Sequence, residues 1–318
     1  MKKKYKRGLL FFFLCFFLFG NAGTKAVTEA EEKPVTISRE ETLVIGRVSD
    51  NPKKHYKRLK SIVDYAAGHM KDLGIRQGSV LMAKNNQELI QYLNEGKLDW
   101  FSESIFSAIY FADKGGAEII LRRWKRGVPD YYSVFFTRKS SGINSLADLK
   151  GKKIAYEDPG SASAYFMPVY ALKKAGLDLV ELSSPRIEPP VDQVGYIFAG
   201  GELNISTWVH KELADAGAFS NLDWEDDDDT LDAFKKDLKI IYKTGSFPRA
   251  LELVRGDLNA KLKKRLKDLL RNAHNDSDAK EALKTYGKTM KFDDIRGETK
   301  VGLINARNIL KYIQKDLK

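Results

Sequence analysis

The residues best suited to chemistry lie in the segment "EDPGSASAYFMPVY", residues 157–170. It follows the expected strand "KIAYE", turns at Pro159 and Gly160, and enters a helix at residues 161–163. The first N–H groups of a helix have no partner inside the helix, and the positive end of its dipole lies there. With the hydroxyls of Ser161 and Ser163, these groups can bind an oxyanion without any lysine. The segment therefore predicts an anion site.

A purely structural role for the same serines stays open. Serine is among the preferred residues at the start of a helix, where its hydroxyl accepts a hydrogen bond from a backbone N–H two or three positions later. Ser161 or Ser163 could therefore simply cap the helix. The local pattern alone does not decide between capping and binding.

Strands alternating with helices must position this segment. The segments "TLVIG", "SVLMA" and "LDWFS" are short apolar strands separated by helices, which predicts a mainly parallel sheet covered on both faces. Two similar strands, around Val134 and Ile241, bracket a second α/β block. We therefore expect two lobes with a ligand cleft between them, the second lobe being inserted into the first. The expected boundaries are 42–136 plus 243–318 for the first lobe and 137–242 for the second.

The first 41 residues predict export and a tether. Five lysines and arginines precede the apolar run Leu9–Phe19, and small residues near Ala22 offer a cleavage point, as in a secretory signal peptide over residues 1–22. The run is about half of the roughly 20 residues that span a bilayer, so a retained anchor is the alternative. Residues 23–41 are polar and aperiodic, as in a flexible tether. We expect a periplasmic protein, with a membrane tether as the open alternative.

Charge and composition exclude several classes of function. Losing residues 1–22 removes five positive charges and lowers the net charge from +11 to +6, and the remaining charge is scattered, so no nucleic-acid partner is expected. The only cysteine, Cys15, lies in the leader. The four histidines are far apart, and the acidic run 223–232 lacks the pattern of a calcium loop. No nucleophile motif is present. We therefore expect no metal, no cofactor and no enzymatic activity.

The chain resembles a known family at "DLKGKKIAYEDPGSASAYFMPVYAL". This stretch is similar to the phosphate, phosphite and phosphonate-binding proteins of bacterial ABC importers, in which a "GDP-x-S-T-S" loop grips the phosphonate. "LVIG", "GKLDWFSESIFSA", "ELADAGAFSN" and "IIYKTGSFP" resemble further segments of that family. The resemblance implies a type II periplasmic-binding-protein fold. It also implies a solute-binding function with ABC permease subunits as partners, and we expect a monomer.

The expected binding residues follow from that resemblance position by position. Ala162 stands where the family has threonine, Asn86 and Glu103 stand where it has tyrosines, and Gly201 replaces a histidine. A carboxylate at Glu103 would repel an anion unless it were protonated or paired with a ligand amine; the alternative is an acid at the start of a helix. The residues expected to bind ligand are Ser161, Ala162, Ser163, Asn86, Ser102, Glu103, Glu202 and Ser220.

Two functions remain compatible with these features. The first is a solute-binding component of an importer for a small anionic or zwitterionic ligand, phosphate-like or phosphonate-like. The second is a periplasmic sensory module that presents its bound ligand to a membrane kinase or another partner. The same fold and pocket would serve both, and the ligand itself is not specified by the sequence.

Overall fold

The computed structural model describes residues 38–49 and 51–314. The expectations for the signal peptide (1–22) and for most of the tether (23–41) concern residues outside this part of the chain. Within it, no helix combines the length and the apolar character needed to cross a membrane.

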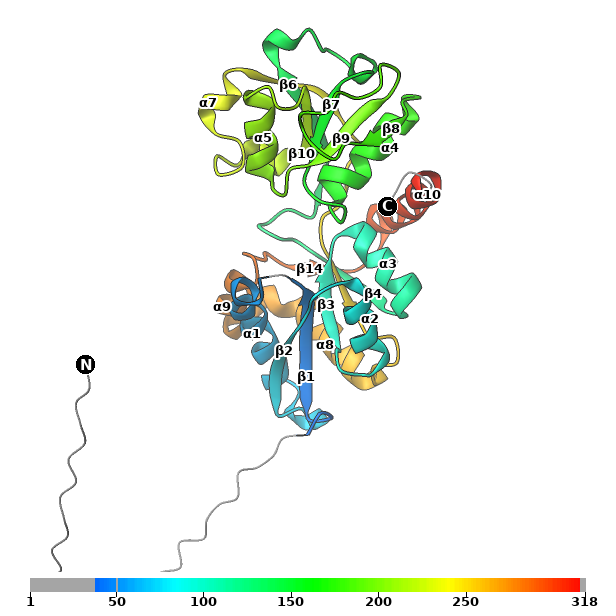
Figure 1. The fold of residues 1–318 in the computed structure, drawn as a ribbon. Helices are drawn as coiled ribbons and strands as arrows, with labels where there is room; N and C mark the ends of the chain where they lie inside the picture. Colours follow the sequence, from blue (N-terminus) through cyan, green and yellow to red (C-terminus); the bar gives the residue numbers. More distant parts are fainter. Residues whose placement is uncertain (1–37, 50, 315–318) are drawn as a thin grey trace, which may run out of the picture. The chain divides into compact units, whose positions relative to one another are not determined.

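Six strands form a first sheet in the order β14-β4-β13-β3-β1-β2 (Figure 1). Strands β1 to β4 run in one direction, while β13 and β14 run against them. The carboxyl ends of β1 to β4 therefore meet at one edge of the sheet. The strands are β1 (Thr42–Val48), β2 (Gln77–Ala83), β3 (Trp100–Glu103), β4 (Glu118–Arg123), β13 (Leu251–Val254) and β14 (Phe292–Asp293).

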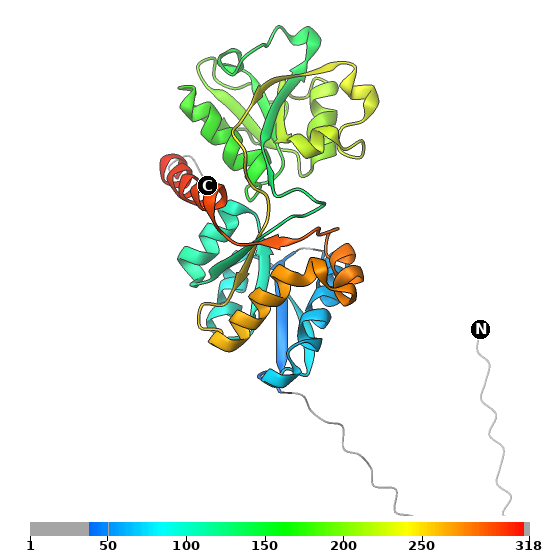
Figure 2. The same cartoon turned by 180° about the vertical axis from the view of Figure 1, so that it is seen from behind.

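Alternating side chains on these strands build two cores, one on each face of the sheet. In β1, Leu43 and Ile45 face one core and Val44 faces the other, because successive side chains of a strand point to opposite faces. Helices α1 (Pro52–Gly68), α8 (Ala260–Asn272) and α9 (Lys280–Thr285) cover the first face, as Figures 1 and 2 show. Helices α2 (Asn86–Asn94) and α3 (Ile105–Gly115) cover the second.

A second six-stranded sheet has the order β11-β6-β10-β7-β9-β8. Only β6 runs against the other strands. Helix α4 (Met167–Lys174) packs on one face and α5 (Glu202–His210) on the other. The strands are β6 (Ser133–Arg138), β7 (Lys153–Tyr156), β8 (Leu179–Glu181), β9 (Val194–Phe198), β10 (Ala216–Ser220) and β11 (Leu238–Lys243).

The remaining elements are short, apart from the last helix, α10 (Gly297–Ile313). Ala306 of α10 belongs to the core that contains α2 and α3, whereas Ile313 is buried in the core beneath α4. The others are β5 (Asp130–Tyr131) paired with β12 (Phe247–Pro248), α6 (Asn221–Glu225), α7 (Asp232–Lys235), a π-helix (Ala162–Phe166), and 3-10 turns at Lys71–Leu73, Lys139–Ser141, Ala147–Leu149, Ala273–Asn275 and Ser277–Ala279.

The mixed α/β architecture, with sheets flanked by helices, confirms the expected fold class. Two segments differ from what their local pattern suggests. The apolar run from Tyr131 to Lys139 would suit one long strand, but it is broken at Tyr132 into β5 and β6, which pair with different partners. Ile304 of the last helix is 52% exposed.

The expected lobe boundaries fall within or at the end of paired strands. The boundary at 136/137 divides β6, and the one at 242/243 divides β11, although both strands pair wholly within the second sheet. We propose that the second lobe instead begins at residue 133 and ends at 243, so that each sheet keeps its own strands.

Gly46 allows β1 and β2 to approach each other. A Cβ at this position would lie 2.5 Å from the Leu81 carbonyl oxygen and 2.8 Å from Leu98 Cδ1. We predict that Gly46→Ala lowers the free energy of unfolding by about 1–3 kcal/mol, because the crowded backbone must shift. Gly68→Ala is the matched control, since nothing lies within 4 Å of its added Cβ. Urea denaturation compares the two; equal stabilities would contradict the prediction.

Candidate functional site

The loop between β7 and the following helix forms a compact turn at the carboxyl edge of the second sheet. The Gly160 amide donates to Asp158 Oδ1 at 2.6 Å, and the Ser161 amide donates to the Asp158 carbonyl at 3.2 Å. The helix starts with the π turn at residues 162–166 and continues as α4. The strand, the turn and the helix start therefore lie where the sequence predicts them.

The serines have different roles in this loop. Ser161 Oγ accepts a hydrogen bond from the Ala164 amide at 3.1 Å, so Ser161 caps the helix. Ser163 is buried, and its hydroxyl lies within hydrogen-bonding reach of the Tyr131 phenol. Within the described residues, the amides of Ala162 and Ser163 have no hydrogen-bond acceptor. These two amides are therefore the donors that the loop can offer to an oxyanion.

Carboxyl groups surround this loop. Burial, followed by the negative charges of Glu202 and Asp158, raises the pKa of Glu157 to about 8. Burial also raises the pKa of Asp158 and of Asp223, and raises that of Asp229 to about 7. Part of this acidic group is therefore protonated at neutral pH. A protonated carboxyl group can donate a hydrogen bond instead of repelling an anion.

Two further expected residues lie at the same edge of the second sheet. Glu202 is the first residue of α5 and lies close enough to Glu157 to raise its pKa. Ser220, at the end of β10, forms a capping box: its hydroxyl accepts from the Asp223 amide at 3.2 Å, and its own amide donates to the Asp223 carboxylate at 3.0 Å. The hydroxyl also donates to the same carboxylate at 2.6 Å. Ser220 is buried. Its hydroxyl is thus already used inside the protein.

The carboxyl edge of the first sheet carries Ser102 and Glu103, at the end of β3. Burial raises the pKa of Glu103 to about 7, although Arg47, the Ser104 amide, Arg123 and Lys125 oppose the rise. Glu103 directly precedes Ser104, the N-cap residue of α3. The expected repulsion of an anion by Glu103 is therefore reduced by protonation and by the neighbouring cations.

The basic side chains at this edge were missed by the sequence analysis. We call Arg47, Arg123, Lys125 and Arg249 the strand-end cations. Burial, followed by the charges of Arg123, Arg249 and Arg47, lowers the pKa of Lys125 to about 7. Three of these cations could have been recognised in the sequence as basic residues at the ends of apolar strand segments, in "TLVIGRV" and "EIILRRWKR".

Arg249 connects the strand-end cations to the loop at residues 160–163. Its Nη1 donates to the Lys125 carbonyl at 2.6 Å, and its guanidinium carbon lies 5.9 Å from the centre of the Tyr131 ring. Tyr131 in turn lies against Ser163. The segment from Trp124 to Tyr132 therefore contributes Lys125 and Tyr131 to this group.

Asn86 lines a cavity of about 660 Å³ together with Pro159 and Gly160. Its neighbour Asn85 caps α2 by accepting from the Glu88 amide. Asn86 is exposed and so available for contact. Ser102 and Glu103 do not line this cavity, so the expected residues are divided between two regions.

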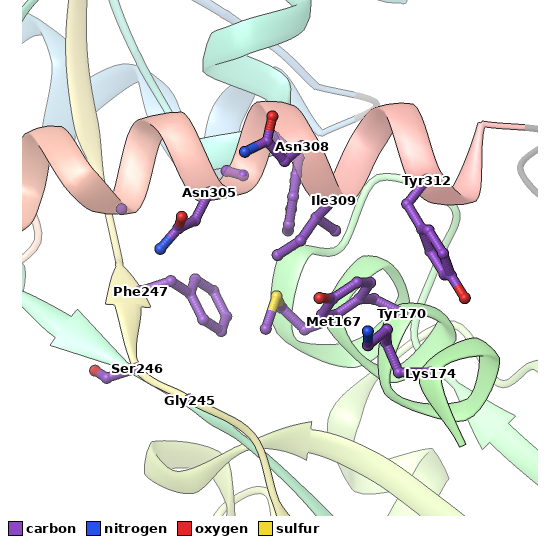
Figure 3. A pocket seen from close by; sticks show the side chains of 13 residues that line it. Met167, Tyr170, Lys174, Gly245, Ser246, Phe247, Asn305, Asn308, Ile309 and Tyr312 are labelled. Carbon is purple, nitrogen blue, oxygen red and sulfur yellow. The ribbon is translucent and has the colours of Figure 1, made fainter. Parts of the chain in front are cut away.

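A second cavity, of about 550 Å³, lies where α10, α4 and the residues before β12 come together (Figure 3). Asn305, Asn308, Ile309 and Tyr312 line it from α10. Its only charged lining residue is Lys174. It contains none of the residues expected to bind ligand, and its aromatic and amide lining is a poor match for an oxyanion.

Comparison with known proteins shows the family. Residues 49–299 match the family described as "ABC transporter, phosphonate, periplasmic substrate-binding protein". The chain belongs to this family. Its description is that of a binding protein, not of an enzyme.

Individual relatives agree with this assignment. The structure of XAC2383 from Xanthomonas citri bound to ATP is 33% identical, with a TM-score of 0.82, over 87% of this chain and 100% of that one. PhnD1 from Prochlorococcus marinus in complex with methylphosphonate is 18% identical, with a TM-score of 0.62, over 87% and 99%. The phosphate-import protein PhnD of Mycolicibacterium smegmatis is 30% identical over 29% of this chain and 32% of its own length. The fold is therefore that of type II periplasmic binding proteins.

The raised pKa of Glu157, caused first by burial and then by the charge of Glu202, predicts a pH-dependent stability. The pKa of Glu157 is about 8 in the folded protein, above its ordinary value of 4.5. Protonated Glu157 is therefore favoured by folding, and this stabilisation is lost as the pH rises from 4.5 through 8. We predict that Glu157→Gln has a higher melting temperature than the wild type at pH 8. Each 1 kcal/mol of added unfolding free energy corresponds to about 2–4 °C in melting temperature.

Thermal unfolding at pH 5 and pH 8 measures this difference. The advantage of Glu157→Gln should shrink towards pH 5, where the wild-type carboxyl is also protonated. Glu188→Gln is the control, since Glu188 is an exposed carboxylate that pairs with Lys153. A stability difference that is the same at both pH values would contradict the raised pKa.

Proposed function

We propose that this protein is the periplasmic solute-binding component of an ABC importer and binds a small phosphorus oxyanion. The family match over residues 49–299 supports the importer. The unpaired amides of Ala162 and Ser163 support the oxyanion, because they lie at the start of a 13-residue helical segment, residues 162–174.

The proposed ligand lies between the carboxyl edges of the two sheets. On one side it accepts hydrogen bonds from the Ala162 and Ser163 amides, with Glu202 nearby. On the other side it faces Ser102 and Glu103. Tighter binding to a closed arrangement of the two lobes would then drive closure, as in other binding proteins that move by a hinge. The closed form is what the permease subunits would recognise.

A ligand screen tests this function directly. We expect phosphate, methylphosphonate, 2-aminoethylphosphonate or ATP to raise the melting temperature in proportion to the logarithm of its concentration over its dissociation constant. Ethanesulfonate and acetate serve as oxyanions without phosphorus. The absence of a shift with every phosphorus compound would contradict the proposal.

The loop is tested by substitutions that remove one donor at a time. Ser163→Ala keeps the backbone amide and removes only the hydroxyl, which lies near the Tyr131 phenol, so it should change affinity for the best phosphorus compound less than about 3-fold, below the ~3- to 10-fold expected for one lost hydrogen bond. Ala162→Pro removes only an N–H group at a helix start, and Ser161 has ψ of 123°, which a following proline accepts. We expect about 10-fold weaker binding or more.

Matched variants separate binding from folding. Ser183→Ala removes an exposed hydroxyl outside the loop. Ala162→Val adds comparable bulk to the buried position but keeps the N–H group. A calorimetric affinity that is unchanged in Ala162→Pro would remove the loop from the binding site.

A further inference from the structure

The strand-end cations lack matching negative charge. Arg123 forms an ion pair with the buried carboxylate of Glu252, with Nε and Oε1 3.5 Å apart. Arg47 contacts His55 at 3.1 Å and the Val48 carbonyl, and Arg249 donates to a carbonyl. Within the described residues, the Lys125 amine has no hydrogen bond or ion pair. Arg249 interacts with the charge of Asp223, and Lys125 is partly neutral at pH 7 because its pKa is lowered to about 7. The remaining excess of positive charge lies on Arg47, Arg123 and Lys125, whose nearby carboxyl groups are Glu252 and the partly protonated Glu103.

Unused donors are buried at the same place. Arg123 Nε and Ser102 Oγ are inaccessible to solvent and make no hydrogen bond of normal geometry among the described residues. Arg123 Nε has only its ion pair with Glu252, at 3.5 Å, and the Ser102 hydroxyl lies close to Glu252 and Tyr286. Buried donors without partners are costly. A bound acceptor at this position would supply the missing partners.

Three of the strand-end cations and Ser102 line a small cavity. Its volume of about 60 Å³ is several times the ~10–15 Å³ needed to hold one water molecule. The cavity therefore has room for one small anionic group, and the rest of a longer ligand would lie outside it. Its lining residues include Arg47, Arg58, Ser102, Arg123 and Lys125.

We propose that the strand-end cations bind a second anionic group of the same ligand, which is therefore a di- or triphosphate. This inference rests on the proposed function and specifies its ligand. A single phosphonate at the Ala162 and Ser163 amides would leave the excess positive charge uncompensated. A phosphate chain compensates it with further charges along one molecule, and the charged donors provide the stronger hydrogen bonds.

A series of side-chain contacts runs from one subsite to the other. Ser163 lies against Tyr131, the Arg249 guanidinium lies beside the Tyr131 ring, and Arg249 Nη1 contacts the Lys125 carbonyl at 2.6 Å. These contacts place the loop and the strand-end cations on either side of Tyr131 and Arg249. The proposed ligand extends past these two side chains, with one phosphate at the amides and another at the strand-end cations.

The test is a calorimetric series of phosphate, methylphosphonate, pyrophosphate, tripolyphosphate, AMP, ADP and ATP. We expect affinity to rise with the number of phosphates. Lys125→Gln should weaken the binding of tripolyphosphate and ATP about 10-fold or more, the range expected for one hydrogen bond to a charged group. It should change the affinity for phosphate and methylphosphonate less than about 3-fold. Arg47→Gln should act in the same way. Lys261→Gln, an exposed cation of α8, is the control.

The outcomes separate this inference from the proposed function. Binding of phosphate or methylphosphonate with no preference for longer chains, and no effect of Lys125→Gln, would overturn the second subsite while leaving the importer function intact. No binding of any phosphorus compound would overturn both. Equal affinities for tripolyphosphate and ATP would show that the protein recognises the phosphate chain itself. Binding of ATP alone, still sensitive to Lys125→Gln, would add a nucleoside contact.

Discussion

The meeting of strand carboxyl ends at one edge of each sheet is the constraint on which the site depends. Because β1, β3 and β4 run in the same direction, Arg47, Glu103 and Arg123 come together although they are far apart in the chain. The same rule brings the loop after β7 close to Glu202, after β9. A parallel arrangement therefore gathers polar groups where the backbone leaves the sheet, a common location for ligands.

The two edges differ in charge, and the difference has a physical effect. The first sheet presents the strand-end cations, whereas the second presents Glu157 and its acidic neighbours around two unpaired amides. Burial moves the pKa values of Glu103 and Lys125 towards neutrality. Neutral hydrogen bonding at one edge and positive charge at the other are the two features on which the proposal of an elongated anion rests.

Much of the fold could be predicted from the sequence, but less of the site. Apolar runs of strand length, separated by amphipathic helices, identified both sheets, and the "DPGS" turn chemistry located the loop. The sequence did not reveal that Glu157 and Glu202 interact across 45 positions, or that Arg249 returns to Lys125. These contacts depend on how the strands cross over between neighbours, and no local periodicity encodes that path. Ser220 was expected in the site because a motif resembled it, yet its hydroxyl serves a cap.

Helix α10 adds a mechanical element to this arrangement. It supplies Ala306 to one core and Ile313 to another, and a Cβ on its Gly302 would lie 2.9 Å from Pro248 Cδ in β12. Any rotation of one sheet against the other must therefore slide or bend this helix as well as the connecting strands. The helix and the connecting strands would both resist such a rotation. A side chain at Gly302 would therefore change how easily the sheets rotate without contacting a ligand.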